Sequence, residues 1–167
     1  YKKIKEIIPG SVTGTACNMS FFEPGPGPFN RLMASVSDRL WNRYFINRVV
    51  SSADFIGVNY YFHNRINYGF NKNENLKVSD MGWELYPQGI ENVLLGLKKY
   101  NLPVLITENG LADASDEKRP WFIETTLHSV YNAMEKGADV KGYFHWSLID
   151  NFEWDKGFWP RFGLISV

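Results

Sequence analysis

Four stretches of the chain repeat apolar residues at the spacing of an α-helix, and we predict helices at 1–8, 38–50, 87–100 and 120–136. The third stretch has the i, i+3, i+4, i+7 pattern of a half-buried helix, at Ile90, Val93, Leu94 and Leu97. In the fourth stretch we expect four apolar residues to face the core, namely Ile123, Leu127, Val130 and Met134. Pro9 and Gly10 end the first helix, and Asp38 is expected to cap the second.

Shorter runs rich in β-branched and aromatic residues lie between the predicted helices, and we predict strands at 12–22, 54–61, 104–107 and 140–149. Loops rich in Pro, Gly or polar residues follow the first three strands, at 23–28, 64–80 and 112–119, and a loop dense in aromatic and charged residues follows the last, at 150–162. Helices and strands therefore alternate, and the strands are apolar on both faces, which is typical of a parallel sheet covered by helices. No repeat or linker divides the chain, so we expect one α/β domain over residues 1–167.

The most distinctive polar and aromatic residues fall at, or just past, the C-terminal ends of the predicted strands. They are Asn59, Tyr61, Glu108, Trp146, Glu153 and Trp154. No strand is followed by the Gly-x-Gly-x-x-Gly turn of a dinucleotide-binding fold or by a phosphate loop. A (β/α)8 barrel builds its site at the C-terminal ends of its strands, and it needs at least about 200 residues. With four predicted strands in 167 residues, we predict half of such a barrel.

Composition and charge exclude several classes of protein. Apolar residues make up 44% of the chain, as in a globular domain, and 18 Lys and Arg balance 18 Asp and Glu, so we expect no nucleic-acid partner. No apolar run is as long as a membrane span, and Tyr1 does not open a signal peptide, so we expect no membrane association. The single Cys17 excludes an internal disulfide and agrees with a reducing compartment, so we expect a cytoplasmic location.

The aromatic content is high, at 16%, with 6 Trp, 9 Tyr and 12 Phe. Aromatic rings fill protein cores, and they also pack on the C–H faces of sugars, so the content alone does not separate these two uses. His63, His128 and His145 have no metal-ligand spacing, and we expect no metal. No Ser or Cys has the setting of a nucleophile. Carboxylates among aromatic residues remain, and these are typical of glycoside cleavage, in which two acids flank the scissile bond.

The segment 103–110, Pro-Val-Leu-Ile-Thr-Glu-Asn-Gly, ends a short apolar run in a carboxylate. A buried strand here carries Glu108 to its C-terminal tip, and an Asn-Gly turn follows at once. A carboxylate at such a tip is partly desolvated and rigidly held, which are the conditions that a reactive acid needs. The same position suits a residue that caps the turn or the next helix, so this segment alone leaves both interpretations open.

Three long motifs resemble those of family 1 glycoside hydrolases, the β-glucosidase and β-galactosidase family. The segment 106–110, Ile-Thr-Glu-Asn-Gly, resembles the nucleophile motif of that family, and 54–61 resembles its sixth barrel strand. The segments 143–154 and 157–163 resemble its eighth strand and sugar-binding loop, and 82–87 is also similar. The resemblance is collinear over nearly the whole chain. It implies strands 5 to 8 of a (β/α)8 TIM barrel, without strands 1 to 4 and without the closing helix.

The resemblance also implies roles for individual residues. Glu108 is expected to attack the anomeric carbon of a β-linked sugar, forming a glycosyl–enzyme ester that water hydrolyses with retention of configuration. Tyr61 is expected to hydrogen-bond to Glu108 and to hold its rotamer. Five further residues are expected to bind the sugar, namely Asn59, Trp146, Glu153, Trp154 and Phe162. Taken in isolation, Tyr61 and Trp146 suit a plain aromatic core better than a sugar site, and Asn59 suits a strand-end turn equally well.

Other charged and polar residues near these motifs are expected to have structural roles. We expect Asp150 and Asn151 to form hydrogen bonds within their loop, because both are turn formers. Arg161 is expected to pair with a local acid. Glu23 and Glu84 lie in loops near the strand ends, but their sequence context assigns neither of them a role.

The chain departs from the family pattern in a way that bears on activity. The general acid/base of the family is a Glu in a Thr-x-Asn-Glu-Pro motif after the fourth strand, and no such motif occurs in this sequence. The first predicted helix is expected to be the one that follows that strand. Proton transfer by such a residue contributes about 10²–10⁴-fold, so we expect weak or no hydrolysis by these residues alone. Glycoside cleavage needs two acids, and it implies no cofactor.

Two other hypotheses stay open, a non-catalytic carbohydrate-binding half-barrel and a fragment with no function of its own. A four-stranded parallel half-barrel has two bare edges, which tend to pair with other strands. We therefore expect association with a missing N-terminal barrel half or with a second copy of the chain. These residues do not distinguish one sugar configuration or one aglycone from another.

Overall fold

The computed structural model describes residues 1–166 and contains a four-stranded sheet with its strands in the order β1-β2-β3-β4. The strands are β1 (Gly14–Pro24), β2 (Phe55–Ile66), β3 (Val104–Asn109) and β4 (Val140–His145). Each strand pairs in parallel with the next strand along the chain. This confirms the predicted parallel sheet. Consecutive strands are also neighbours in a (β/α)8 barrel, so the strand order agrees with part of one.

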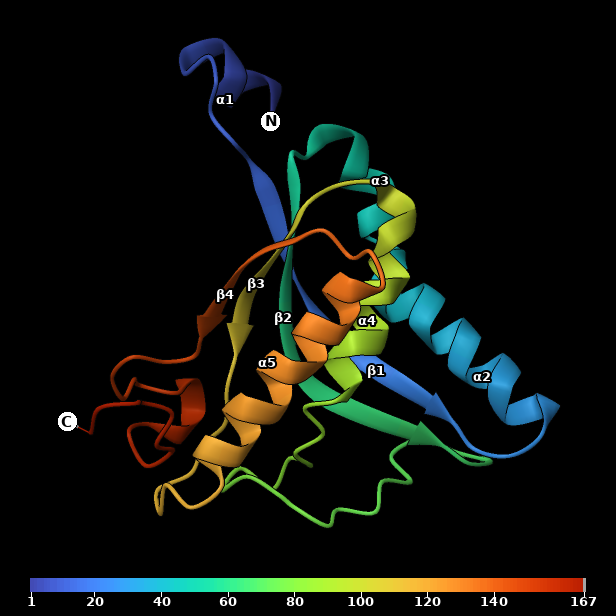
Figure 1. Ribbon diagram of the computed structural model, residues 1–167, viewed down its shortest axis with the longest axis vertical. Coiled ribbons are helices and arrows are strands. Elements are labelled where there is room, and N and C mark those ends of the chain that lie inside the picture. Colours follow the sequence, from blue (N-terminus) through green and yellow to red (C-terminus); the bar gives the residue numbers. More distant parts are fainter. Residues whose placement is uncertain (167) are drawn as a thin grey trace.

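The structure has five α-helices within residues 1–166, and those between the strands lie on one face of the sheet (Figure 1). The five helices are α1 (Lys2–Ile7), α2 (Pro28–Asp38), α3 (Ile46–Val49), α4 (Gly89–Leu97) and α5 (Arg119–Glu135). A π-helical segment (Arg39–Arg43) follows α2, and 3₁₀ turns lie at Val50–Ser52, Lys98–Tyr100 and Trp154–Lys156. Helix α1 stands away from the sheet, and none of its residues is buried (Figure 1).

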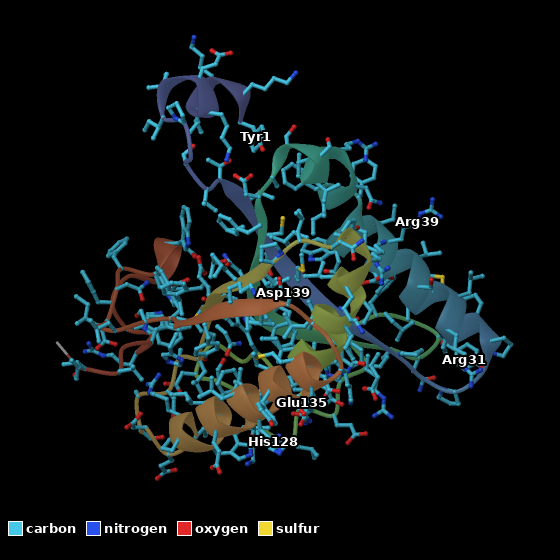
Figure 2. All side chains as sticks on the ribbon, turned by 45° about the horizontal axis from the view of Figure 1, so that its top comes forward. Tyr1, Arg31, Arg39, His128, Glu135 and Asp139 are labelled. Atoms are coloured by element: carbon cyan, nitrogen blue, oxygen red, sulfur yellow. The ribbon has the colours of Figure 1, made fainter. Side chains whose placement is uncertain are left out.

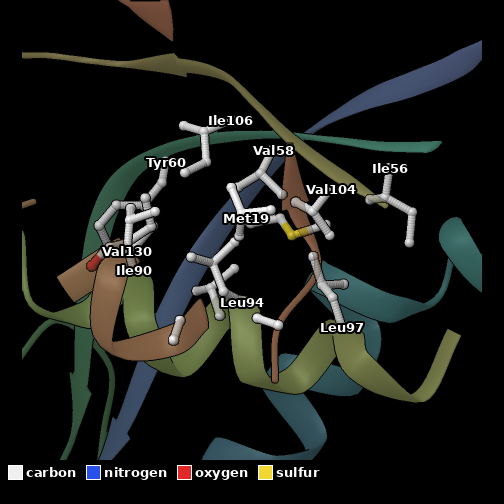
Figure 3. Close-up of a cluster of buried hydrophobic side chains, with 14 of the residues drawn as sticks. Met19, Ile56, Val58, Tyr60, Ile90, Leu94, Leu97, Val104, Ile106 and Val130 are labelled. Atoms are coloured by element: carbon white, nitrogen blue, oxygen red, sulfur yellow. The ribbon is translucent and has the colours of Figure 1, made fainter. Parts of the chain in front are cut away.

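The main hydrophobic core lies between the sheet and helices α4 and α5 (Figure 3). Met19, Val58 and Ile106 come from three adjacent strands, and each is 0% exposed. The four residues of α4 that were predicted to face inward are all buried in the same cluster, namely Ile90, Val93, Leu94 and Leu97. The buried face of α4 was therefore predicted correctly, because the large side chains on that face are all apolar.

The second face of the sheet carries the alternate residues of each strand. Ala16 and Asn18 of β1, and Phe144 of β4, are exposed on this side. Within residues 1–166, β1 and β4 each have one neighbouring strand, so the sheet has two edges. At the edge of β1, the side chain of Asn42 bonds to the main-chain N–H and carbonyl of Ser20, at 3.0 and 2.8 Å. The open face and these edges are where further chain can pair.

The prediction of which residues of α5 face the core is wrong at two positions, because Leu127 is 44% exposed and Met134 is 45% exposed. The buried residues of α5 are Arg119, Phe122, Thr126, Ser129, Val130 and Ala133. Several of these are small, and small side chains let a helix pack closely on its neighbours. Ser129 Oγ also satisfies its hydrogen bond locally, to the carbonyl of Thr125 at 2.8 Å. An apolar repeat does not reveal such a face, since small polar residues occupy part of the buried arc.

Three predicted boundaries also differ from the structure. Helix α2 begins at Pro28, where proline suits the first turn, so Asp38 is not a cap and instead accepts from Asn42 Nδ2 at 2.8 Å. Strand β2 runs on to Ile66, because it stays paired with β1 as far as Pro24. Strand β4 ends at His145, since the main chain beyond it pairs with residues 162–165.

Leu94→Ala is expected to lower the free energy of unfolding by about 2–5 kcal/mol, because it leaves a cavity in the core. Leu127→Ala, on the exposed arc of α5, is expected to change it by about 0.5 kcal/mol or less. Urea denaturation followed by circular dichroism measures both changes. Similar losses in the two variants would contradict the orientation of α5 described above.

Candidate active site

Glu108 is the penultimate residue of β3, and Tyr61 on the adjacent β2 donates its hydroxyl to Glu108 Oε2 at 3.0 Å. Burial raises the pKa of the Tyr61 hydroxyl, and the charge of Glu108 and the hydrogen bond to it raise that pKa further. Tyr61 therefore stays protonated at neutral pH and remains a donor to the carboxylate. The structure thus brings together the two residues that were predicted to form the nucleophile and its orienting partner.

A shift in strand register turns Glu108 towards Tyr61. Ile106 is buried in the core, so strict alternation along β3 would place Glu108 on the same face, under the helices. The register between β2 and β3 shifts, so that Asn59 pairs with Glu108 and Thr107 is passed over. An extra residue of this kind re-aims the side chains that follow it, and such bulges are common beside active sites.

Asn59 lies beside this pair and is itself oriented by a hydrogen bond. Thr107 Oγ1 donates to Asn59 Oδ1 at 2.6 Å, so the amide oxygen is engaged as an acceptor. The amide nitrogen of Asn59 is then the group that has protons to donate to a ligand. Thr107, which the register shift leaves without a partner on β2, thus fixes the orientation of the Asn59 amide.

Trp83 joins the aromatic residues around Glu108. Its ring centroid lies 6.0 Å from that of Tyr61, 4.9 Å from that of Phe62 and 6.4 Å from that of Phe162. Phe162 is buried, and Trp83 is half-buried. The segment 82–87 resembles part of a known family, but the sequence did not indicate that the ring of Trp83 lies between Phe162 and Tyr61.

Arg119 fixes the loop after β4 against the loop after β3. Its Nη1 donates to the carbonyls of Leu111 and Phe162, at 3.0 and 3.1 Å. Its Nη2 donates to the carbonyls of Asp113 and Arg161, at 2.8 and 3.1 Å. The guanidinium is buried, and its bonds to these four carbonyls join the two loops. Sequence analysis missed this residue, because an arginine next to the proline that starts a helix has the pattern of a surface residue.

The loop 150–162 also has its own polar contacts. Arg161 pairs with Asp150 at 2.9 Å, and Asp150 Oδ1 accepts from the main-chain N–H of Gly163 at 3.0 Å. These contacts confirm the expected structural roles of Asp150 and Arg161. Asn151 Nδ2 donates to Glu153 Oε2 at 2.7 Å, so the side chain of Asn151 supports a residue that is expected to bind sugar.

The three remaining predicted sugar-binding residues differ in their setting. The charge of Glu153 contributes to the raised pKa of Tyr61, after burial and the effects of Glu108, so Glu153 is close enough to Tyr61 for its charge to act there. Trp146 is half-buried, and a side chain at Gly110 would clash with its carbonyl oxygen. Trp154 is 85% exposed and projects into solvent. The roles of these three residues in binding a sugar stay predictions.

Glu23 and Glu84, to which the sequence assigned no role, both contact His63. The ring Nδ1 lies 2.5 Å from Glu84 Oε2, and Nε2 lies 3.0 Å from Glu23 Oε2. The ring stacks on Tyr86, with centroids 3.9 Å apart, and Phe21 lies beside both rings, at 5.6 Å from His63 and 6.1 Å from Tyr86. This cluster ties the segment around Glu84 to the ends of β1 and β2, and it accounts structurally for both carboxylates.

Residues 1–166 contain no group of three His, Cys, Asp or Glu side chains that could hold a metal ion. Cys17 is a free thiol, and burial raises its pKa. In the same range of residues, no helix has both the length and the apolar character that crossing a membrane requires.

Arg119→Lys is expected to lower the free energy of unfolding by about 2 kcal/mol, because a single ammonium cannot keep the buried bonds that the guanidinium makes to both loops. Arg48→Lys is a matched control, since Arg48 is exposed and bonds to one carbonyl, that of Tyr44. Chemical denaturation of both variants measures the difference. Equal stability of the two variants would contradict the linking role of Arg119.

His145 makes stability depend on pH. Burial, with the positive charge of Arg119 nearby, lowers the pKa of His145 to about 4. In the unfolded chain the ring of His145 takes up a proton near pH 6.5, whereas in the folded chain it does so only near pH 4. The free energy of unfolding therefore decreases as the pH falls from about 6.5 to 4. We expect the unfolding free energy of His145→Gln to vary less between about pH 6.5 and 4. His128→Gln is the control, since His128 is exposed on the outer side of α5 (Figure 2). The unfolding free energy of this variant should depend on pH as it does in the wild type.

The sequence model of a family described as Glycosyl hydrolase family 1 matches residues 30–167. A β-galactosidase from Sulfolobus acidocaldarius is 42% identical over 201 residues, which cover 100% of this chain and 40% of that protein. A 1,4-β-D-glucan glucohydrolase from Thermotoga neapolitana is 36% identical over 140 residues, covering 73% of this chain and 33% of that protein. The chain therefore spans less than half the length of these curated relatives.

Solved structures of TIM-barrel β-glucosidases are similar to this fold. The β-glycosidase from Pyrococcus horikoshii matches 98% of this chain and 45% of its own, with a TM-score of 0.85 and 35% identity. A β-glucosidase from Thermotoga maritima in complex with glucoimidazole matches 99% of this chain and 48% of its own, with a TM-score of 0.88 and 28% identity. From the matched family and these relatives, we conclude that the chain belongs to glycosyl hydrolase family 1.

Proposed function

We propose that this chain forms strands 5 to 8 of a retaining β-glycosidase and that Glu108 is its nucleophile. The observation that carries the proposal is the contact between Glu108 Oε2 and the Tyr61 hydroxyl at 3.0 Å, at the C-terminal end of β3 and beside the parallel strand β2. This is the face on which a (β/α)8 barrel builds its site. The two curated relatives described above are a β-galactosidase and a 1,4-β-D-glucan glucohydrolase, which supports a β-linked sugar as substrate.

The geometry supports a two-step displacement. Tyr61 holds one oxygen of Glu108, Oε2, and the other oxygen attacks the anomeric carbon. The bond from that carbon to the leaving oxygen breaks, and its electron pair goes to the leaving oxygen, which takes a proton from a general acid. Water then attacks the same carbon, gives its proton to the general acid that was deprotonated in the first step, and releases the Glu108 carboxylate, so two inversions give net retention. The hydrogen bond from Tyr61 stabilises the ionised nucleophile and limits its rotation.

The general acid is proposed to come from outside these 167 residues. The sequence has no Thr-x-Asn-Glu-Pro motif, which carries that acid in the family. Each of β1 and β4 has one strand neighbour within residues 1–166, so an N-terminal barrel half or a second copy of the chain would pair at these edges. Activity towards unactivated glycosides is then weak or absent without that partner. We retain a cytoplasmic location as a proposal, since the single Cys17 suits a reducing compartment.

The proposed sugar contacts follow from the types of group around Glu108. Asn59 offers an amide nitrogen, and Glu153 offers a carboxylate that can accept from two hydroxyls. Trp146 would support the ring of the sugar, Phe162 would close one side, and Trp154 would donate its indole N–H. Trp154 is largely exposed, and contact with a sugar would cover its ring.

A second candidate function is sugar binding without catalysis. The loop 150–162 is held by Arg119 and by the Asp150–Arg161 pair, and neither support involves Glu108. Such a loop could bind a sugar even where no acid/base completes the reaction. Calorimetric titration with glucose or cellobiose, in the absence of any turnover, would support this function.

An activated glycoside tests the proposed nucleophile directly, because a 2,4-dinitrophenolate leaves without a proton from a general acid. We expect 2,4-dinitrophenyl 2-deoxy-2-fluoro-β-D-glucoside or its galactoside to add one fluoroglycosyl group to Glu108, as seen by intact mass and peptide mapping. Glu108→Gln is expected to abolish the adduct. Glu135→Gln, at the exposed end of α5 (Figure 2), should keep it. An adduct on another residue, or none, would contradict the assignment.

A further inference from the structure

We propose that Asn109 is the positioning residue for Glu108, and that Tyr143 and His145 hold Asn109 through a directed chain of hydrogen bonds. The inference rests on the proposed function, in which Glu108 is the nucleophile. It assigns a role in that reaction to three residues that do not contact the carboxylate themselves.

The regular ladder of the sheet does not hold Glu108 on both sides. On β2 its partner is Asn59, reached only after a register shift. The register between β3 and β4 also shifts, between Ile106 and Asn109, and Glu108 has no partner on β4. The main chain that carries the proposed nucleophile therefore lies between two irregular ladders. Its position has to be set by other contacts.

Asn109 provides these contacts at the next residue. It is 0% exposed, and its Nδ2 donates to the carbonyl of Tyr60 on β2 at 2.6 Å. Its Oδ1 accepts from the Tyr143 hydroxyl on β4 at 3.1 Å. Its main-chain carbonyl accepts from the N–H of Trp146 at 2.9 Å. Asn109 thus joins β3 to both neighbouring strands where the ladders are interrupted, one residue after Glu108.

The donor and acceptor roles in this chain follow from what each atom can do. The Tyr60 carbonyl only accepts, so the Asn109 atom beside it must be the amide nitrogen. The amide oxygen also only accepts, so the Tyr143 hydroxyl donates its single proton to it. Nδ1 of His145 lies 3.2 Å from the same hydroxyl, and it must therefore carry a proton and donate. The alternative amide orientation would set two oxygens against each other at the Tyr60 carbonyl.

The surroundings of His145 agree with this direction. Its Nε2 is buried and has no hydrogen-bond partner in the part of the chain that the structure describes. A proton on Nε2 would leave a donor unsatisfied, whereas a proton on Nδ1 has the Tyr143 oxygen as its acceptor. Burial and the nearby charge of Arg119 lower the pKa of His145 to about 4, so the ring carries a single proton at neutral pH. Burial also raises the pKa of Tyr143, which stays a hydroxyl.

Nuclear magnetic resonance of the full chain tests the direction of the hydrogen bonds without any substrate. We expect long-range ¹H–¹⁵N spectra to show His145 protonated on Nδ1 and bare on Nε2. The chain has 3 histidines, so His63 and His128 are the remaining signals to assign. Tyr143→Phe removes the acceptor of Nδ1, and the His145 signals are expected to change towards the Nε2-protonated form. A wild-type ring protonated on Nε2 would overturn the proposed chain.

The hydroxyl proton of Tyr61 reports the position of Glu108, again without substrate. We expect this proton to be visible in the wild type through its bond to Glu108, and to disappear in Tyr61→Phe. Tyr143→Phe should shift or broaden it, because Asn109 loses its anchor on β4. Tyr131→Phe removes an exposed hydroxyl from α5, and it should leave the Tyr61 signal unchanged. An unchanged Tyr61 signal in Tyr143→Phe would overturn the positioning role.

Labelling kinetics with the activated fluoroglycoside separate positioning from general damage. In Tyr143→Phe we expect the maximal rate of labelling to fall about 10- to 100-fold, with little change in the concentration needed for half-maximal rate. A loss of fold would instead affect both parameters and the melting temperature. Wild-type rates in Tyr143→Phe would contradict the inference. Failure to label the wild type would contradict the proposed function, and the two spectroscopic readouts would still decide the inference.

Discussion

In a regular parallel strand alternate side chains share a face, and Glu108 would then share the buried face of Ile106. One extra residue, Thr107, breaks this alternation and brings Glu108 to the Tyr61 hydroxyl instead. The remaining features of the site depend on that break. Asn59 receives its partner from Thr107, and Asn109 supplies the links to both neighbouring strands that the interrupted ladders do not.

The energy that supports this irregularity comes from the other face of the sheet. A cluster of buried aliphatic side chains from the strands packs against α4 and α5, and it requires no irregular backbone. Several buried polar groups near the strand ends form specific hydrogen bonds. Arg119 satisfies four carbonyls of the loops after β3 and β4, and these bonds place Phe162 near the aromatic cluster of Trp83 and Tyr61. Rigid support of this kind is what a positioned carboxylate needs.

Predictions from the sequence succeeded where one physical effect dominated. The apolar repeat of α4 covers its whole buried arc, so Leu94 and its neighbours were placed correctly. On α5, small and polar residues such as Thr126 and Ser129 share the buried arc, so Leu127 was placed inward when it is exposed. The start of α2 was missed because the preceding Pro- and Gly-rich loop hid the role of Pro28 as its first residue.

The sequence by itself determined four features: the parallel sheet, the buried face of α4, the glycosidase family that the motifs resemble, and the position of Glu108 at a strand end. These depend on local periodicity and on residue types, which are written along the chain. Only the tertiary structure decided which face Glu108 occupies, that Trp83 and Arg119 belong to its surroundings, and that Asn109 is held by Tyr143 and His145. These features depend on register between strands and on pairings across distant segments, and no local pattern encodes a one-residue shift.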